Sequence, residues 1–276
     1  MMNILEALVN IAENKDYEIN EYTQGNNRAQ NMGEALEEYI FDAFSNSFHI
    51  KDNEKRINEH QKTFSFLGSK NKIPDAILRN GHALEVKKST SESTIQLNSS
   101  YPKHTLKSCD TRIKSSALIC EDKPWEEKEM IYCFGYIPKG SKHIKSLWFV
   151  YGRVFCDLPE VYEEIIDNIR VNLNDDYEGN ELGGATGIDS LNITRLRVRG
   201  MWVIDHPQKV FSNLIKDWNN TKFEVKALIP KSIFNNFPED SKNKISKSQF
   251  TIEEVEVTDP TNRAKNIESL FIYFKE

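Results

Sequence analysis

The sequence contains few cysteines, and their spacing excludes the usual cysteine-based architectures. Its 276 residues include four of them, Cys109, Cys120, Cys133 and Cys156, at long, irregular separations and without a CxxC pair. This arrangement argues against a zinc site and against a disulfide framework. Cys133 and Cys156 lie in apolar runs that are typical of strands, so we expect reduced, buried thiols in a cytoplasmic protein.

Long apolar runs are also missing from the sequence. No stretch approaches the roughly 20 apolar residues that a transmembrane helix needs, and the first residues lack the basic segment and cleavage site of a signal peptide. Ile4, Leu8 and Ile11 instead recur at helical spacing, which predicts an amphipathic helix. With 38% hydrophobic and 28% charged residues, the composition is typical of globular proteins, and we expect no membrane segment.

An excess of basic charge is absent as well. The net charge of −6 argues mildly against nucleic acid as a partner, but the distribution of charge matters more than its sum. Lysine and arginine outnumber acidic residues in 85–114 and 195–231, whereas acidic residues gather in 34–42, 121–129, 157–181 and 253–259. This segregation suits a protein with one basic face.

The hydrophobic pattern predicts an α/β fold. We expect helices over 28–48, 159–173, with Ile165 and Ile169 facing inward, and 209–218. We expect strands over 73–78, 82–88, 129–137, 146–155, 193–204, bent at Gly200, 222–229, 250–257 and 269–274, and loops over 89–114, 174–187 and 235–248. The interpretation is a single domain, 1–276, with a mixed central sheet flanked by helices, a core over about 28–175 and a β-rich C-terminal elaboration over about 176–276.

One segment carries a chemical motif: Pro74-Asp75, nine intervening residues, then Glu85-Val86-Lys87. Phosphodiester hydrolysis needs a hard cation that polarises the phosphate, and Mg²⁺ takes oxygen ligands, often only one or two carboxylates. Asp75 and Glu85 are the candidate carboxylates, and the Val86 carbonyl is a candidate further ligand. Lys87 projects from the same strand face as Glu85, where it could orient the attacking water or offset negative charge in the transition state.

The register of the predicted hairpin decides whether Asp75 joins the other two side chains. A two-residue turn would pair Asp75 with Val86 and turn its side chain away from Glu85 and Lys87. A three-residue loop, Arg79-Asn80-Gly81, pairs Asp75 with Glu85 and places all three groups on one face. The chemistry therefore requires the odd loop or a bulge, and the alternative is an ordinary hairpin with surface charges.

The pattern P-D-x₉-E-x-K resembles the signature of the PD-(D/E)XK nucleases, whose core has the same order of a helix, three strands, a helix and a strand. Residues 31–39, NMGEALEEY, resemble the helix glutamate motif of these nucleases. Glu37 fits the glutamate position best, Glu34 is the second candidate, and a solvated helix face is the alternative for both.

The segments LNSSYPKHTL at 97–106, EVKK at 85–88 and RVRGMW at 197–202 resemble the NgoPII-type family of type II restriction endonucleases over most of the chain. The resemblance implies a homodimer that cleaves double-stranded DNA within the palindrome GGCC with Mg²⁺, and a cognate DNA methyltransferase as its functional partner. It also makes 176–276 the expected DNA-recognition part of the chain. The alternatives are another PD-(D/E)XK nuclease, for repair or mobile-element processing, and a non-catalytic DNA-binding module.

Two groups of residues are candidates for DNA contact. Small donors cluster in the first, which comprises Asn98, Ser99, Ser100, Tyr101 and Lys103; such side chains make most phosphate and sugar contacts, although an Asn/Ser/Pro turn is the simpler interpretation. The second group alternates along one predicted strand and comprises Arg195, Arg197 and Arg199. Arginine most often reads guanine, but a solvated edge strand is the alternative.

Two other features are interpreted as structural. His82 and His104 lie near the predicted site, but the proposed chemistry does not require histidine. The segment GGATG at 183–187 lacks the Lys-Ser/Thr ending of a phosphate-binding loop.

Overall fold

A mixed β-sheet forms the centre of the molecule. The computed structural model describes residues 2–19, 28–68, 73–172, 182–185, 190, 196–215 and 221–276. The sheet strands, in spatial order, are β1 (Phe64–Leu67), β2 (Ala76–Leu78), β3 (Ala83–Ser89), β6 (Glu127–Tyr136), β7 (Ser146–Tyr151), β11 (Glu224–Pro230), β13 (Asn262–Lys275) and β12 (Thr251–Asp259), and β5 (Thr105–Lys107) pairs with β6. The pairs β3–β6 and β7–β11 are parallel and the others are antiparallel, so the predicted α/β class with a mixed central sheet is confirmed.

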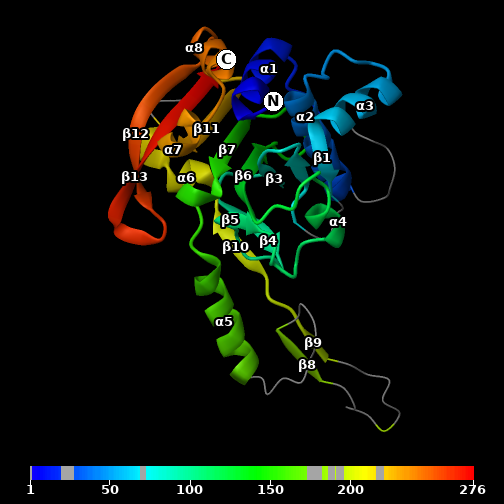
Figure 1. The fold of residues 1–276 in the computed structure, drawn as a ribbon, viewed down its shortest axis with the longest axis vertical. Coiled ribbons are helices and arrows are strands. Elements are labelled where there is room, and N and C mark those ends of the chain that lie inside the picture. The colour runs from blue at the N-terminus through cyan, green and yellow to red at the C-terminus, as the bar shows by residue number, and fades with distance from the viewer. Residues whose placement is uncertain are drawn as a thin grey trace.

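Helices pack on this sheet at its upper end (Figure 1). They are α1 (Ile4–Asn14), α2 (Arg28–Ser45), α3 (Asn53–Thr63), α7 (Lys231–Asn235) and α8 (Glu239–Ser246). The predicted amphipathic helix is α1, capped by Asn3, whose side chain accepts the Leu5 N–H at 2.9 Å. Helix α2 approaches β6 closely because Gly135 has no side chain; a Cβ there would lie 2.6 Å from Leu36 Cδ2.

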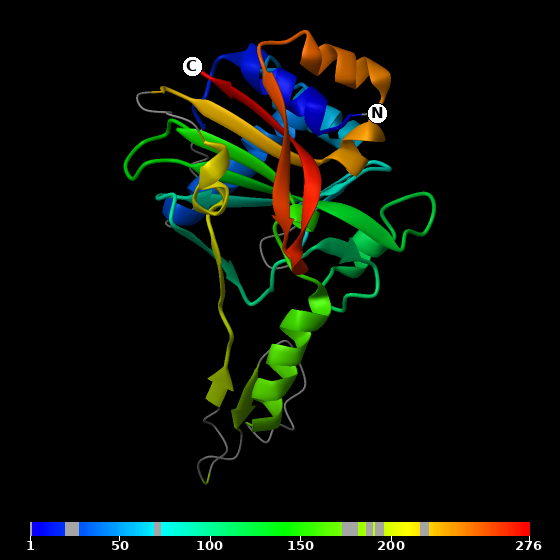
Figure 2. The ribbon, with the colours of Figure 1, turned by 90° about the vertical axis from the view of Figure 1, so that its left-hand side faces the viewer.

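A second part of the chain projects away from the sheet (Figures 1 and 2). It contains α5 (Pro159–Asn172) and the strand pair β8 (Gly183–Ala185) and β9 (Leu196–Val198). The ribbon of β4 (Thr94–Asn98) and β10 (Trp202–Asp205) connects this projection to the sheet. The prediction that Ile165 and Ile169 face inward is wrong: their side chains are 45% and 37% exposed, because the inner face of α5 carries Tyr162, which stacks on Tyr101.

Several predicted loops contain regular structure. The segment 89–114 contains β4 and β5, and 235–248 contains α8. The predicted helix 209–218 is replaced by the short α6 (Pro207–Val210) and the 3₁₀ turn η2 (Ser212–Leu214), and the strand 146–155 ends in the 3₁₀ turn η1 (Gly152–Val154). The short helix α4 (Ser115–Leu118) precedes β6. Strands β11, β13 and β12 of the C-terminal part extend the central sheet.

Across the described ranges, no helix is both long enough and apolar enough to cross a bilayer.

Candidate active site

The hairpin of β2 and β3 has the odd register. Ala76 lies opposite Leu84 and Ile77 lies opposite Ala83, and the same register continued by one residue places Asp75 opposite Glu85. Asn80, in the turn, has a φ of 54°, which Asn tolerates better than most residues. The expectation that the three-residue loop governs the pairing is therefore confirmed.

The backbone around Asp75 is fixed from both sides. Its N–H donates to the Leu84 carbonyl at 3.0 Å, and its side-chain Oδ2 accepts the Val86 N–H at 2.7 Å. On the other side, the Gly68 N–H donates to the Asp75 carbonyl at 2.6 Å. A Cβ on Gly68 would lie 2.5 Å from the Pro74 carbonyl oxygen, so glycine is required for this approach. Nothing in the sequence marks Gly68 as part of the site, because a lone glycine outside the motif carries no distinguishing signal.

Lys87 lies between the two carboxylates. Its Nζ donates to Glu85 Oε1 at 2.5 Å and to the Val86 carbonyl at 3.3 Å, and it is 3.8 Å from Asp75 Oδ2. Burial alone would lower the pKa of Lys87, but the charges of Glu85 and Asp75 outweigh it and raise that pKa above its ordinary value. The two acids therefore favour the charged form of the lysine.

The carboxylates of the site carry more negative charge than Lys87 balances. Burial, and then the charge of Asp75, raises the pKa of Glu85 to about 7. The same two causes raise the pKa of Glu37 on α2 to about 8, and Lys87 and Glu85 also act on it. The structure thus brings Glu37 within electrostatic reach of all three motif residues, while Glu34 contributes to its pKa more weakly. An added cation would favour the charged form of each acid.

The donor set fits Mg²⁺. Glu85 is 5% exposed, and within the described residues its Oε2 has no hydrogen-bond partner, so one buried oxygen is available as a ligand. Lys87 Nζ lies within 3.8 Å of Glu85 Oε1, the Val86 carbonyl and Asp75 Oδ2, so these oxygens surround one point. Among the described side chains, no group of three or more His, Cys, Asp and Glu is placed to hold a metal, and Mg²⁺ commonly takes only one or two carboxylates together with water and substrate oxygens.

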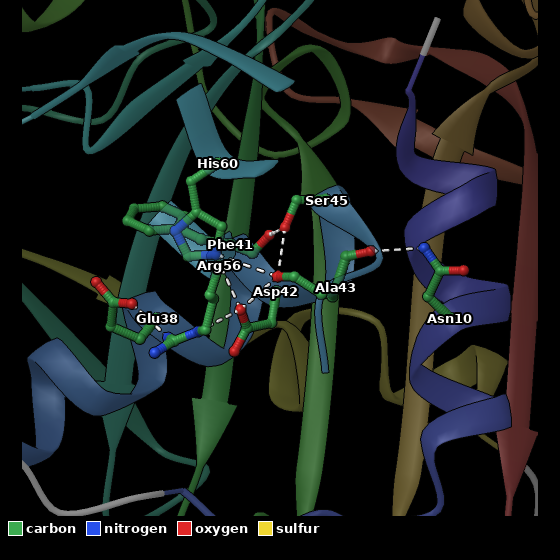
Figure 3. A network of polar contacts seen from close by, with 9 residues as sticks. Asn10, Glu38, Phe41, Asp42, Ala43, Ser45, Arg56 and His60 are labelled. Atoms are coloured by element: carbon green, nitrogen blue, oxygen red, sulfur yellow. Dashed lines mark hydrogen bonds and ion pairs between the residues drawn. The ribbon is translucent and has the colours of Figure 1, made fainter. Parts of the chain in front are cut away.

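A buried polar network fixes the helix that carries Glu37 (Figure 3). Asp42 Oδ1 accepts from Arg56 Nε at 2.7 Å and contacts His60 Nε2 at 2.8 Å and Ser47 Oγ at 2.6 Å. Arg56 also binds Glu38, next to Glu37. The three residues Ser47, His60 and Asp42 do not form a nucleophilic triad, because the serine and the aspartate meet the same imidazole nitrogen. The network instead joins α2 to α3.

The first group of predicted DNA contacts is divided by the structure. Tyr101 and Lys103 are 2% and 3% exposed. The Tyr101 hydroxyl donates to Glu163 at 2.6 Å, and Lys103 Nζ pairs with Asp110 at 2.5 Å. A DNA contact by either would require these partners to be exchanged. Ser99 is exposed and Ser100 is half-buried, whereas the side chain of Asn98 lies outside the described residues.

The second group is partly described. Arg197 lies in β9 and Arg199 follows it, and both are exposed on the projecting part of the molecule. Arg195 lies outside the described residues. The sequence indicated Arg112 only as part of a basic segment. In the structure Arg112 pairs with Glu163 of α5 at 3.0 Å and with Asp110 at 2.9 Å, so it holds the N-terminal end of α5.

Burial lowers the pKa of two histidines, His82 and His206. His82 Nδ1 lies 3.0 Å from the Tyr151 hydroxyl, and burial lowers the pKa of His82 to about 4. Burial, and then Lys226, lowers the pKa of His206 to about 4 as well. His104 Nδ1 lies 2.9 Å from the Cys156 carbonyl oxygen, a backbone contact of the kind expected for a structural histidine.

We expect acid to destabilise the fold through His82 and His206. Each has a folded-state pKa below the ordinary 6.5, so the unfolded state binds more protons, and stability falls as pH decreases from about 6.5 to 4. At pH 5 the loss should be about 2 kcal/mol for each histidine. Urea unfolding of wild type and His82→Gln at pH 7 and pH 5 isolates the contribution of His82, because the raised pKa values of Glu37 and Glu85, which stabilise the fold as the pH falls, act alike in both proteins. The change in free energy of unfolding from pH 7 to pH 5 should be about 2 kcal/mol less favourable in wild type than in His82→Gln, and an equal change in the two proteins would contradict this prediction.

The sequence is similar to known proteins over nearly its whole length. Residues 2–258 match the family model described as NgoPII restriction endonuclease. The type II restriction enzyme NgoPII of Neisseria gonorrhoeae is 39% identical over 272 residues, which is 96% of each protein. No solved structure matches the chain. The region of similarity includes the hairpin with Asp75, Glu85 and Lys87.

Proposed function

Because the chain belongs to the NgoPII restriction endonuclease family, we propose that it is a type II restriction endonuclease that hydrolyses phosphodiester bonds of double-stranded DNA at a short palindrome. The observation that carries the proposal is the arrangement of Asp75, Glu85 and Lys87 on one face of a hairpin. DNA binding alone gives no reason to place two carboxylates beside a phosphate, since they repel it.

The fold and the site together support a PD-(D/E)XK nuclease. Asp75, Glu85 and the Val86 carbonyl would hold Mg²⁺, which when bound would polarise the scissile phosphate and lower the pKa of the attacking water. Lys87, held between the carboxylates, positions that water and offsets the charge that develops on the phosphate. Glu37 faces the same site from α2, where Asp75, Lys87 and Glu85 all act on its pKa, and serves as an outer or second-metal ligand.

The target of the proposed enzyme is GGCC, as implied by the resemblance to the family. Digestion of plasmids with mapped GGCC sites, with and without prior methylation of those sites, tests this assignment. Discrete fragments that end within GGCC, and protection by methylation, support it. A smear, nicks at branched structures, or retarded but uncut DNA would contradict a sequence-specific endonuclease, and discrete fragments with other ends would contradict GGCC alone.

The protein should act as a homodimer in the cytoplasm, alongside a DNA methyltransferase that protects the host sites. A palindrome has twofold symmetry, and a C₂ dimer presents one active site to each strand. Light scattering of the complex with a short GGCC duplex in Ca²⁺ should give the mass of two chains and one duplex. One chain per duplex with both strands cut in Mg²⁺ would contradict this prediction.

We expect at least one arginine of the group Arg195, Arg197 and Arg199 to read guanine. The projecting strand offers forked donors on exposed side chains at Arg197 and Arg199, and each GGCC half-site shows two guanines in the major groove. Alanine at a base-reading position should cost about 1–3 kcal/mol of binding and relax specificity at one base pair, whereas loss of a phosphate contact weakens all sequences alike. Binding to cognate and single-base-variant duplexes distinguishes the two. Three variants that bind like wild type would exclude this strand, and Ser99 and Ser100 would become the next candidates.

A further inference from the structure

The tripeptide Glu-Val-Lys occurs twice in the sequence, at 85–87 and at 224–226. The second copy lies on β11, in the same sheet as the first. The registers connect them: Lys87 pairs with Phe134, Phe134 with Trp148, and Trp148 with Lys226. Because paired residues project from the same face of a sheet, Lys226 and Lys87 lie in one row on one face, separated by two strands.

The second lysine is completely enclosed. Lys226 is 0% exposed, its Nζ donates to Glu224 Oε1 and to Gln208 Oε1, the latter at 2.8 Å, and Ser146 Oγ lies 3.5 Å away. The indole N–H of Trp148 donates to the same Gln208 oxygen at 2.9 Å. A buried ion pair rarely stabilises a fold more than apolar side chains of the same size would. Stability alone therefore gives little reason for a lysine at this position.

Residues at the ends of the β4–β10 ribbon lie next to Lys226. Glu92, in the short link between β3 and β4, is half-buried, and the charges of Lys226 and Glu224 act on its pKa. The backbone N–H of His206, directly after β10, donates to the Ser93 carbonyl at 2.9 Å. His206 Nδ1 accepts the Gln208 N–H at 3.1 Å. Both strands of the ribbon thus meet the sheet at the Lys226 cluster, which comprises Glu92, Ser146, His206, Gln208, Glu224 and Lys226.

The ribbon joins the catalytic strand to the projecting part of the molecule. Strand β3 carries Glu85 and Lys87 and ends at Ser89, and only residues 90–93 separate it from β4. Beyond β4 lie Ser99 and Ser100, and β10 is preceded by Arg197 and Arg199. The position of these residues relative to Lys87 therefore depends on how the base of the ribbon is held.

We propose that Lys226 is a positioning residue: through Gln208 and His206, and through the charge of Glu92, it fixes the β4–β10 ribbon relative to the catalytic strand. The inference rests on the proposed function. Lys226 is buried and acts through Glu92, Gln208 and the ribbon, without contact with DNA. Loosening the cluster shifts the scissile phosphate relative to Asp75, Glu85 and Lys87, and misplacement by about 1 Å can cost roughly 100-fold in rate.

Two variants, one single and one double, test the proposal by different routes. Glu92→Gln keeps the size of a half-buried side chain and removes the charge that faces Lys226. Lys226→Met combined with Glu224→Gln removes the buried pair without leaving a lone charge. Lys231→Met is the matched control, because Lys231 pairs with Glu254 and Glu268 on the exposed side of the same sheet. Circular dichroism and thermal unfolding select the temperature at which all variants are folded.

The expected result is a separation of binding from turnover. In Ca²⁺, the Kd of Glu92→Gln for a GGCC duplex should stay near that of wild type, while single-turnover cleavage in Mg²⁺ falls about 10- to 100-fold. The discrimination of cleavage against single-base variants of the site should fall together with the cleavage rate. The double variant Lys226→Met, Glu224→Gln should give the same results as Glu92→Gln. Unchanged turnover and discrimination in Glu92→Gln, or an equal loss in Lys231→Met, would overturn the proposal. Wild-type protein that cuts no DNA would instead overturn the proposed function.

Discussion

Replacement of Lys87 by alanine is expected to lower the cleavage rate about 1000-fold, below detection in a plasmid assay. Lys87 Nζ lies 2.5 Å from Glu85 Oε1 and 3.8 Å from Asp75 Oδ2, and it is the cation that the structure places between these acids. Its loss removes the group that positions the attacking water and offsets charge on the phosphate. Single-turnover cleavage in Mg²⁺ measures the rate, and gel retardation in Ca²⁺ should show that the variant still binds DNA.

The neighbouring lysine provides the control for this substitution. Lys88 follows Lys87 on β3, so its side chain projects from the opposite face of the sheet. Lys88→Ala should therefore retain most of the cleavage activity. Asp75→Ala and Glu85→Ala should be as inactive as Lys87→Ala, whereas Glu37→Gln should be milder because Glu37 reaches the site from a different element. Full activity in any of the three motif variants would remove that residue from the proposed mechanism.

Removal of divalent metal is expected to stop cleavage completely. Without a cation, Asp75, Glu85 and Glu37 face a phosphate with only Lys87 to oppose them, and burial, and then the charge of Asp75, already raises the pKa values of Glu85 and Glu37. EDTA should abolish cutting, and added Mg²⁺ or Mn²⁺ should restore it. Ca²⁺ should support binding but little cleavage, because it is larger and accepts a looser coordination geometry.

The metal prediction can be separated from loss of the fold. Mn²⁺ bound per chain, measured by paramagnetic resonance on wild type and on Asp75→Ala, should fall in the variant while Lys88→Ala binds as wild type does. Robust cleavage in EDTA would contradict the use of a metal. Equal Mn²⁺ binding by Asp75→Ala and wild type would contradict the assignment of the ligand.

The sequence predicted the local geometry of the candidate site well, because that geometry is determined by short-range chemistry. The chemistry of the motif required an odd loop or a bulge, and in the structure the loop is Arg79-Asn80-Gly81, with a positive φ at Asn80 and Asp75 opposite Glu85. Strand alternation then puts Lys87 on the same face. Helix α2 was predicted for the same reason: apolar residues such as Leu36 and Ile40 repeat at helical spacing and are buried.

The parts that could not be predicted depend on distant partners. Tyr101 and Lys103 lie in a polar stretch that resembles a surface turn, but Glu163 on α5 and Asp110 cover them. The apolar spacing of Ile165 and Ile169 identifies a helix face and cannot show whether anything covers it. Helix α3 has almost no apolar residues, and its buried side chain is His60, held by Asp42. No hydrophobic period marks such a helix.

The family was predictable because its motifs are spread along the chain, but the choice between Glu37 and Glu34 was not. The two residues are three apart on one helix, so both point toward the same side. Their neighbours in the structure favour Glu37, because Asp75, Lys87 and Glu85 all act on its pKa. Gly68 could not be predicted either, because its role depends on the backbone of Asp75, which packs against it.

Cleavage of an end-labelled duplex that contains a single GGCC site tests the central claim most directly. Wild type and Lys87→Ala are compared in Mg²⁺ at saturating protein, and the products are resolved to single nucleotides. Wild type is expected to cut both strands within GGCC, whereas Lys87→Ala is expected to bind the same duplex and leave it intact. An intact duplex with wild type, cuts outside the site, or equal cutting by the two proteins would contradict it.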